Sequence, residues 1–423
     1  MVLIYLLAFI GLIWVLTRLY RALVPAPDDR PPAALEGAPF RSTSDVLTVL
    51  GSHLNAPVCE GNRVVLLENG DEIFPSMLEA ISNARSSVHL LTYIYWTGAI
   101  AERFASALAE ASARGVTVRL LLDAYGARLM REPLIERLQG AGVEIAWFHP
   151  LLSLDLQRLN NRTHRKVLVV DGRVAFTGGV GIAEEWTGHA QDADHWRDDH
   201  FRLEGPVVAA LQGAFAEEWL SATGHALMGA ELYPPLVSVG EARCLPLLTS
   251  PRARWSPVAY CYWWALRTAQ ERVDIATPYF VPDEDLLQTI LETARRGVRV
   301  RLLVPNDHND SIAVRWASRA CYPDLIENGV ELYEFTPTMM HTKTLCSDGR
   351  WCFLGSANFD NRSFALNDEV TVMVDDPGLA ADLTRSFEAD LTRSQRIHAS
   401  TYRSIGWTQR ALSHVALLLR AQL

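Results

Sequence analysis

The chain has 423 residues, of which 49% are apolar, and this is more sequence than one hydrophobic core usually serves, so two domains are expected. The formal net charge of −10 argues against a protein whose main partner is nucleic acid, because such binding depends on Lys and Arg neutralising phosphates. The six cysteines include no C-x-x-C pair, which favours reduced thiols over a disulfide framework.

The first 24 residues form an apolar segment. Residues 2–16 are apolar apart from one glycine, and Arg18 and Arg21 follow them. A helix over residues 1–24 is long enough to span a membrane, and the flanking arginines predict a single pass through the cell membrane with the bulk of the protein on the cytoplasmic side. A cleaved signal peptide is the alternative, but the segment lacks a positively charged start and a clear A-x-A cleavage site.

Residues 25–60 are expected to form a tether between this helix and the folded part of the chain. Five prolines lie within residues 25–39, mixed with Ala, Asp and Arg. This composition is too polar and too rich in proline to pack into a core.

Strands and helices alternate along the remainder of the chain. Runs of strand-forming residues occur at 63–67, 88–96, 116–123, 143–148, 273–280, 298–304 and 330–335, with helical periodicity between them. Gly115 and Gly297 end equivalent helices and lie 182 residues apart, so a unit of about 180 residues has been duplicated. The alternation predicts α/β domains over residues 61–235 and 236–423, each with a mostly parallel mixed sheet flanked by helices.

Each half contains one copy of an H-x-K-x4-D motif. On a strand, residues i and i+2 point to the same face, so each histidine would project beside its lysine. Beside a phosphodiester, a neutral imidazole can attack phosphorus while a fixed ammonium stabilises the charge on the non-bridging oxygens. Such a site requires no metal and no cofactor. The candidate catalytic residues are His164, Lys166, Asp171, His341, Lys343 and Asp348.

Each motif is followed by glycine at the same offset. The second copy reads Gly-Ser-Ala-Asn and the first reads Gly-Gly-Val-Gly, so the two half-sites are inequivalent. The candidate substrate-binding residues are Gly179, Ser356 and Asn358. Both motif aspartates precede a glycine in a common turn pair, which favours a structural role for them.

The duplicated motif resembles the paired HKD motifs of the phospholipase D superfamily. The run of residues 358–369 and the segments 196–198 and 203–206 resemble the cardiolipin synthase branch of that superfamily, and the resemblance extends from about residue 61 to the C-terminus. It implies two tandem phospholipase D-like domains that abut, so that both motifs share one active site. It also implies that asparagine usually follows the glycine pair, which the second copy keeps at Asn358 and the first copy lacks.

The resemblance also implies roles for the site residues. One histidine forms a covalent phosphohistidine and the other transfers protons, and family precedent assigns these roles to His164 and His341 respectively. Asp198 and Glu369 stand at the start of strands and are expected to orient a motif histidine through its second ring nitrogen.

Two further segments leave alternatives open. The cluster Tyr260, Tyr262, Trp263 and Trp264 reads better as core or interface aromatics than as a platform for acyl chains. The last segment, around Trp407 to Arg420, is either an amphipathic helix that lies on anionic lipid or a helix packed on the domain.

The expected function is that of a membrane-anchored phosphatidyltransferase, similar to cardiolipin synthase. It would transfer a phosphatidyl group from one phospholipid to the headgroup alcohol of phosphatidylglycerol through a phosphohistidine. Its partners would be phospholipids and the membrane, with no nucleic acid. The alternative is a phospholipase D that hydrolyses phospholipids to phosphatidic acid; a nuclease and an inactive membrane scaffold are weaker alternatives.

Overall fold

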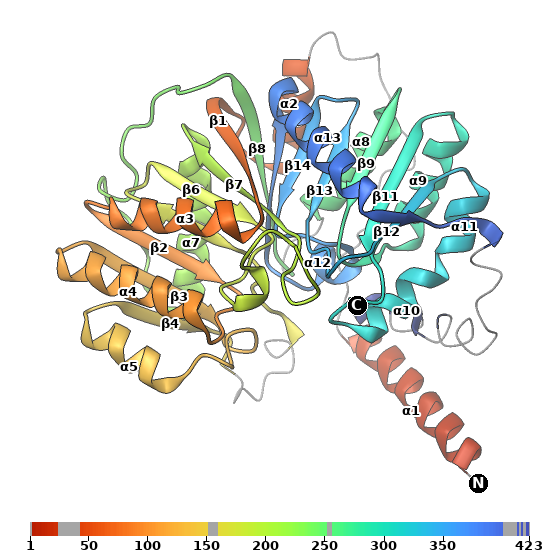
Figure 1. The fold of residues 1–423 in the computed structure, drawn as a ribbon, viewed down its shortest axis with the longest axis horizontal. Coiled ribbons are helices and arrows are strands. Elements are labelled where there is room, and N and C mark those ends of the chain that lie inside the picture. Colours follow the sequence, from red (N-terminus) through yellow and green to blue (C-terminus); the bar gives the residue numbers. More distant parts are fainter. Residues whose placement is uncertain are drawn as a thin grey trace.

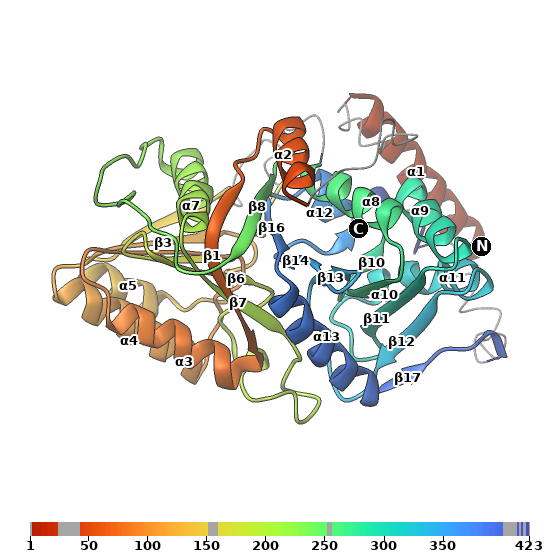
Figure 2. The same cartoon turned by 90° about the horizontal axis from the view of Figure 1, so that it is seen from above.

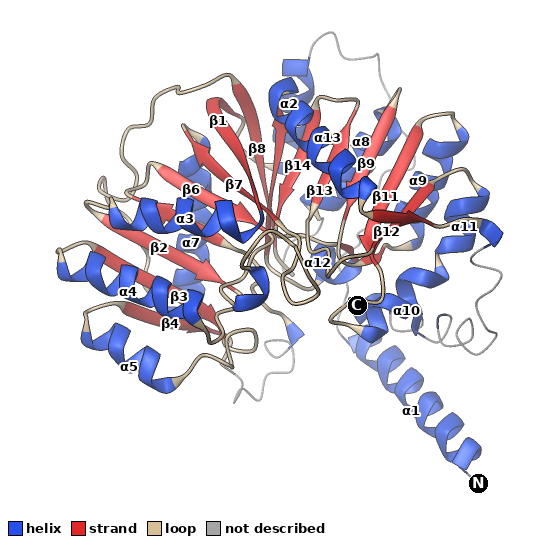
Figure 3. Cartoon of the chain, viewed as in Figure 1, coloured by secondary structure: helices blue, strands red, loops and turns tan. Residues whose placement is uncertain are grey.

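The structure is a computed structural model, and it describes residues 2–23, 43–150, 160–251 and 256–400, together with residues 413, 416, 417 and 420–422. Two α/β halves lie side by side and share one continuous sheet of 15 described strands (Figures 1 and 3). The strand order is β17-β12-β11-β9-β13-β14-β16-β8-β1-β7-β6-β5-β2-β3-β4. The halves join where β1 pairs with β8.

The first half is built from the elements β1 (Cys59–Glu68), α3 (Asn69–Ser82), β2 (Ser87–Thr92), α4 (Ala99–Ala113), β3 (Thr117–Asp123), α5 (Glu132–Gly140), β4 (Glu144–Phe148), β5 (Val167–Val170), β6 (Val174–Gly178), β7 (Asp199–Glu204) and α7 (Val207–Thr223), with the short 3₁₀ helix η1 (Glu184–Trp186) before β7. Successive side chains of its strands alternate between two apolar layers, as the pleat of a strand requires. Leu90 packs in the layer of α3 and α4, and Leu91 packs in the layer of α7. Figure 2 shows these helices on opposite faces of the sheet.

The second half repeats this plan with β8 (Ala242–Thr249), α8 (Pro257–Thr268), β9 (Arg272–Ala276), β10 (Phe280–Val281), α9 (Glu284–Arg295), β11 (Arg299–Pro305), α10 (Ile312–Ala320), α11 (Tyr322–Glu327), β12 (Glu331–Phe335), β13 (Thr344–Ser347), β14 (Trp351–Gly355), β15 (Phe359–Asp360), α12 (Asn361–Ala365), β16 (Glu369–Asp375), α13 (Pro377–Thr392), β17 (Ser394–Arg396) and the 3₁₀ helix η2 (Arg420–Gln422). Helices α8 and α9 cover one face of its sheet, while α13 lies on the other and also contacts β1.

The prediction of mostly parallel sheets is wrong. In the part of the chain that the structure describes, ten of the fourteen pairings within the large sheet are antiparallel. Strands joined through helices, β2-β3-β4 and β9-β11-β12, are parallel as expected. The strands after the two motifs are joined by short turns instead, and a short turn can connect only antiparallel neighbours.

The N-terminal segment forms the helix α1 (Val2–Leu23), which projects from the body in Figure 1. Its apolar side chains lie in solvent, with Ile4 67% exposed and Leu7 and Phe9 each 60% exposed. A search of the described residues finds no helix that is both long enough and apolar enough to cross a membrane. The predicted transmembrane helix therefore stays a prediction.

The predicted tether over residues 25–60 is too long. Residues 24–42 lie outside the described part of the chain, but Thr43–Leu54 form the helix α2. Val46, Leu47 and Leu50 recur at helical spacing on one face of α2, and they are buried in the core of the second half. The proline-rich composition ends before α2 begins. The tether prediction can therefore apply only to the residues that precede this helix.

The aromatic cluster of α8 belongs to the core, as predicted. Tyr262, Trp263 and Trp264 are buried there, while Tyr260 is partly buried beside them. All six cysteines are buried and none is paired in a disulfide. Most of the predicted C-terminal helix lies outside the described residues, although Ala416 is buried against α10 and β10.

Candidate active site

The two motifs lie where the halves meet. The backbone N–H of His164 donates to the carbonyl oxygen of Asp368 (2.8 Å), and that of His341 donates to the carbonyl oxygen of Arg197 (2.7 Å). Each histidine is thus hydrogen-bonded through its backbone to a segment of the opposite half. The residue that follows each carbonyl in the chain is a carboxylic acid, so the same backbone contact brings that acid to the histidine.

The carboxylates and histidines are paired crosswise. Nδ1 of His164, in the first half, lies 2.9 and 3.1 Å from the two carboxylate oxygens of Glu369, in the second. Nδ1 of His341 lies 2.7 Å from Oδ2 of Asp198, in the first half. Because an ionised carboxylate only accepts hydrogen bonds, Nδ1 carries the proton in each imidazole and Nε2 keeps its lone pair. Each motif histidine thus takes its carboxylate partner from the opposite half.

Each lysine lies beside its histidine. Nζ of Lys166 donates to the carbonyl oxygen of His164 (3.0 Å), and Nζ of Lys343 donates to that of His341 (2.6 Å) and lies 3.0 and 3.3 Å from its ring nitrogens. The motif residues come immediately before β5 and β13 and do not lie within those strands. The spacing of two residues nevertheless places histidine and lysine together, because the chain is already extended as it enters the sheet.

Burial controls the charge state of the site. It lowers the pKa of His164 to about 4 and that of His341 to about 3, so both imidazoles are neutral near pH 7. Burial, with repulsion between the two ammonium groups, lowers the pKa of Lys166 to about 7, and burial lowers that of Lys343 to about 8. A negatively charged phosphodiester beside these four groups would favour their protonated forms.

The two carboxylates stay ionised in spite of their burial. Burial alone would raise the pKa of Glu369 and of Asp198, but the positive charges and hydrogen-bond donors around them lower both below their ordinary values. Oγ of Ser356 donates to Glu369 (2.5 Å), and the indole Nε1 of Trp186 donates to Asp198 (2.8 Å). Each carboxylate is therefore fixed by a second donor besides its histidine.

Gly179 occupies the place where Ser356 stands in the second half. A Cβ atom at Gly179 would lie 2.1 Å from the Asp198 carboxylate, so only glycine fits there. The structure thus places the predicted residues Gly179 and Ser356 against the two carboxylates, where they shape the pairing with histidine. Trp186 takes over the donor role in the first half, and no sequence pattern pointed to it.

The amide of the second half-site has no counterpart in the first, and the packing there explains why. Asn358 is buried, and its Oδ1 atom has no hydrogen-bond partner among the described residues. At Gly181, the equivalent position, a Cβ atom would lie 2.8 Å from the Cβ atom of Ile94. The packing of Ile94 therefore excludes an asparagine from the first half-site, which agrees with the inequivalence seen in the sequence.

Aromatic rings surround the histidines. The ring of Tyr93 meets that of His164 edge to face, with centroids 5.0 Å apart. The rings of Trp186 and Trp196 lie 5.2 and 5.6 Å from that of His341. These rings supply the desolvation that keeps the imidazoles neutral. Sequence reasoning missed Tyr93 as a site residue because nothing distinguishes it from the other aromatic residues of its strand run.

The two motif aspartates lie elsewhere and hold the turn after each strand. The carboxylate of Asp171 accepts hydrogen bonds from the backbone N–H groups of residues 85–87. The carboxylate of Asp348 accepts the equivalent bonds from residues 270–272. Both residues have positive φ angles, 54° and 51°, which aspartate tolerates better than most residues. This geometry supports the structural role expected for them.

Two buried arginines join the halves around the site. Arg165 donates to the carbonyl oxygens of Glu369 (3.2 Å) and Thr249 (3.2 Å), and Arg197 donates to the carboxylate of Asp390 (2.9 and 3.0 Å). Both side chains are no more than 1% exposed. A buried arginine is costly without partners, so these contacts hold the two halves in one relative position.

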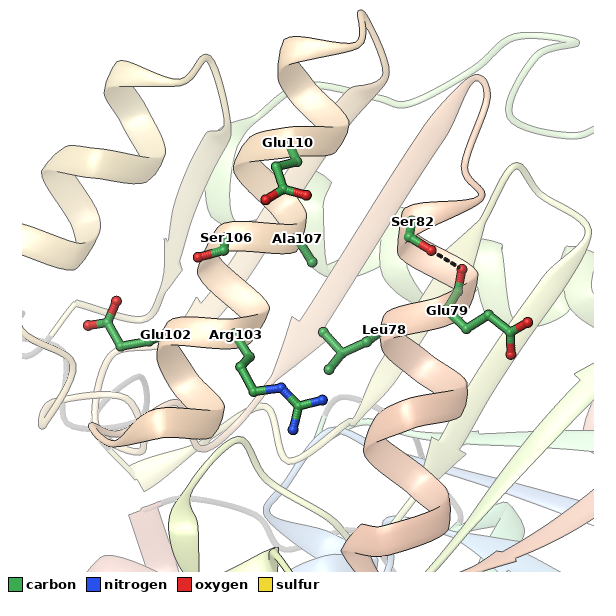
Figure 4. A pocket seen from close by; sticks show the side chains of 8 residues that line it. All are labelled: Leu78, Glu79, Ser82, Glu102, Arg103, Ser106, Ala107 and Glu110. Atoms are coloured by element: carbon green, nitrogen blue, oxygen red, sulfur yellow. Dashed lines mark hydrogen bonds between the residues drawn. The ribbon is translucent and has the colours of Figure 1, made fainter.

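Other features of the surface lie apart from the motifs. A shallow groove of about 490 Å³ runs between α3 and α4, and Figure 4 shows that its side chains come from these two helices. It contains none of the motif residues. Within the described ranges, no group of three or more His, Cys, Asp or Glu side chains is arranged to hold a metal ion.

Two H-x-K half-sites, joined crosswise through the carboxylates of a duplicated α/β fold, define a phosphoryl-transfer enzyme of the phospholipase D type. A family described as "Cardiolipin synthase, PLD-like domain" matches residues 77–219 and 263–391. The chain belongs to this family, and it is a phosphatidyltransferase of the cardiolipin synthase kind.

Relatives in sequence agree with this assignment, and a solved structure has a similar fold. The chain is 33% identical over 392 residues to the cardiolipin synthase of Geobacillus thermodenitrificans, covering 92% of this chain and 78% of that one. It is 37% identical over 366 residues to cardiolipin synthase A of Pseudomonas aeruginosa, covering 86% and 74%. The fold is similar to that of the phosphatidylserine synthase of Haemophilus influenzae, with a TM-score of 0.66 at 14% identity, covering 89% of this chain and all of the other.

Proposed function

We propose that the enzyme transfers a phosphatidyl group from one phospholipid to a headgroup hydroxyl of phosphatidylglycerol, through a covalent phosphohistidine on His164. The observation that carries this proposal is the crossed pairing, in which a carboxylate fixes Nδ1–H of each neutral histidine and the lone pair stays on Nε2. Two such imidazoles are the minimum for a double displacement, in which one attacks phosphorus and the other transfers protons.

In the first step, Nε2 of His164 attacks phosphorus and forms a P–N bond. The P–O bond to the departing headgroup breaks, and His341 gives its proton to the leaving oxygen. The negative charge of the bound phosphodiester favours the imidazolium form of His341 that this step requires. Lys166 and Lys343 stabilise the charge that develops on the non-bridging oxygens, and the amide of Asn358 hydrogen-bonds to one of them.

In the second step, the hydroxyl of the acceptor lipid gives its proton to His341, and its oxygen attacks phosphorus. The P–N bond breaks, which restores His164 and releases cardiolipin. Water is present at tens of molar and competes for the same intermediate, so transfer requires that the acceptor be held in place. The two chemical steps are the same in the hydrolytic alternative, in which water replaces the lipid alcohol.

The products formed from defined vesicles test this proposal. Vesicles that contain phosphatidylglycerol are expected to yield cardiolipin and an equal amount of free glycerol, with phosphatidic acid as a minor product. Mass spectrometry of the lipid extract, with glycerol measured in parallel, checks this. Phosphatidic acid as the main product from every donor lipid would assign the protein to the hydrolases, and cleavage of DNA without lipid turnover would contradict both lipid activities.

We also propose that α1 attaches the enzyme to the cell membrane as a single-pass anchor, that the bulk of the chain lies on the cytoplasmic side, and that the two domains divide near residues 235 and 236. The exposed apolar side chains of α1 support the first point. The absence of a described helix or strand between Thr223 and Ala242 supports the division.

Charges placed in α1 are expected to release the protein from vesicles. Lys at the centre of a membrane helix costs about 2.5–3.5 kcal/mol per residue, so the double variant Leu7→Lys, Phe9→Lys should lose more than about tenfold in vesicle binding, measured by flotation. The matched control is the double variant Met228→Lys, Val237→Lys. It adds the same charge outside α1, at residues that are 83% and 70% exposed. Equal flotation of the two variants would contradict the anchor.

A further inference from the structure

Tyr279 lies between two segments of the second half-site. Strand β9 ends at Ala276, which pairs with Thr344, the residue after the motif lysine. Four residues later, Phe280 pairs in parallel with Phe359, the residue after the buried asparagine. The intervening tyrosine is therefore held by backbone pairing on both sides, next to the chain positions that carry the lysine and the amide.

The hydroxyl of Tyr279 donates to the carboxylate of Asp310, with distances of 2.6 and 2.8 Å to its two oxygens. Asp310 lies in the loop between β11 and α10 and remains exposed. Its negative charge favours the ammonium form of Lys343, and its hydrogen bond to Tyr279 joins it to the second half-site. In the described part of the chain, Asp310 has no ion pair with an arginine or lysine at contact distance.

The phosphoryl-transfer steps leave this pair without a role. A carboxylate at the rim repels the phosphate group, so the ligand that it favours is a hydrogen-bond donor without negative charge at that point. A carboxylate accepts about four hydrogen bonds, and Tyr279 supplies one donor, so most of this capacity is open to a ligand. Backbone pairing sets Tyr279 between the segments that carry Lys343 and Asn358, in the half-site of His341, to which the incoming alcohol is proposed to give its proton.

We infer that Asp310, positioned by Tyr279, accepts a hydrogen bond from a second hydroxyl of a polyol acceptor while the neighbouring hydroxyl attacks the phosphohistidine. The inference rests on the proposed function and names its acceptor class, an alcohol with two vicinal hydroxyls such as a glycerol headgroup. Asp310 thereby distinguishes the acceptor from water, which has no second hydroxyl to be held. The first step, cleavage of the donor lipid, does not use it.

Competition between two soluble alcohols tests the inference on the full chain. Vesicles of phosphatidylglycerol receive 1,2-propanediol and 1-propanol at equal concentration, and mass spectrometry measures the ratio of the two phosphatidyl-alcohols. The wild type should favour the diol, and Asp310→Asn should lower that preference by about tenfold, as expected for the loss of a hydrogen bond to a charged group. In the same variant, phosphatidic acid should rise relative to cardiolipin.

Two further variants sharpen the test. Tyr279→Phe should lower the preference for the diol in the same direction by releasing the carboxylate. Asp307→Asn is the matched control, because Asp307 lies in the same loop, pairs with Arg315 and Arg319, and should leave the ratio unchanged. The ratio is internal to each sample, so a partial loss of folded enzyme does not alter it.

The outcomes separate the inference from the proposed function. An unchanged diol preference in Asp310→Asn overturns the inference while phosphatidyl transfer itself stands. An equal loss of preference in Asp307→Asn also overturns it, because the effect would then come from the total charge of the loop and not from Asp310 itself. If the wild type forms no phosphatidyl-alcohol and no cardiolipin, the proposed function fails.

Discussion

Replacing either motif histidine is expected to abolish turnover without unfolding the protein. In the proposed mechanism, His164→Ala removes the atom that attacks phosphorus, and His341→Ala removes the group that transfers the proton in both steps. A single acid–base group contributes about 10²–10⁴-fold, so each variant should fall below about a hundredth of the wild-type rate of cardiolipin formation. The rate is measured on vesicles of phosphatidylglycerol, and the fold is checked by thermal unfolding.

The two histidine variants should also differ from each other. With a donor lipid whose leaving group needs no proton, His341→Ala should still form a phosphatidyl-enzyme that can be trapped by acid quenching, whereas His164→Ala should form none. His195→Ala serves as the control, because His195 is a surface histidine paired with Asp192. If a folded His164→Ala variant still formed the phosphatidyl-enzyme, the nucleophile would lie in the other half. If it kept wild-type turnover, the shared site would be refuted.

Neutralising the crossed carboxylates is expected to cause the second largest loss. Glu369→Gln and Asp198→Asn keep the size of the side chain, but an amide can also donate a hydrogen bond to Nδ1 and so stabilise the wrong tautomer. The lone pair then moves away from Nε2, where the chemistry occurs. Each variant should lose about a hundredfold or more in the rate of transfer, a loss comparable to that of an acid–base group.

The reaction step that each variant slows distinguishes the two histidine–carboxylate pairs. Glu369→Gln should slow formation of the phosphatidyl-enzyme through His164, although residue 369 lies 205 positions away in the chain. Nitrogen-15 NMR of the labelled histidines should show the change of tautomer directly. Asp192→Asn is the matched control, because it alters a histidine–carboxylate pair on the surface. Full activity in either buried variant would show that the crossed pairing is only structural.

The histidines and lysines of the site follow from the sequence because their spacing is local. Each lysine lies two positions after its histidine, and an extended chain of any fold brings the two together. The pairing of His341 with Asp198 is different, since 143 residues separate them and only the docking of two halves creates it. The sequence pointed to Asp198 and Glu369 through a family resemblance, and it carried no sign of which histidine each would meet.

The misread parts of the fold have a common cause. The alternation of strands and helices gives only their order along the chain. Whether two neighbouring strands are parallel or antiparallel depends on how they are connected. The turns after Val170 and Ser347 contain too few residues for a crossover helix, so the motif strands return antiparallel. Tyr279 and Trp186 were not predicted, because a single aromatic residue forms no periodic pattern in the sequence. Their hydrogen bonds to Asp310 and Asp198 become visible only in the folded chain.

The crossed pairing also sets an order of events during synthesis. His164 is made early in synthesis, and it follows α1, the helix proposed above as the membrane anchor. The carboxylate that orients this histidine, Glu369, leaves the ribosome about 200 residues later. Until then the imidazole lacks the carboxylate that fixes its tautomer. The contact that assembles the site is therefore completed only after most of the chain has been made.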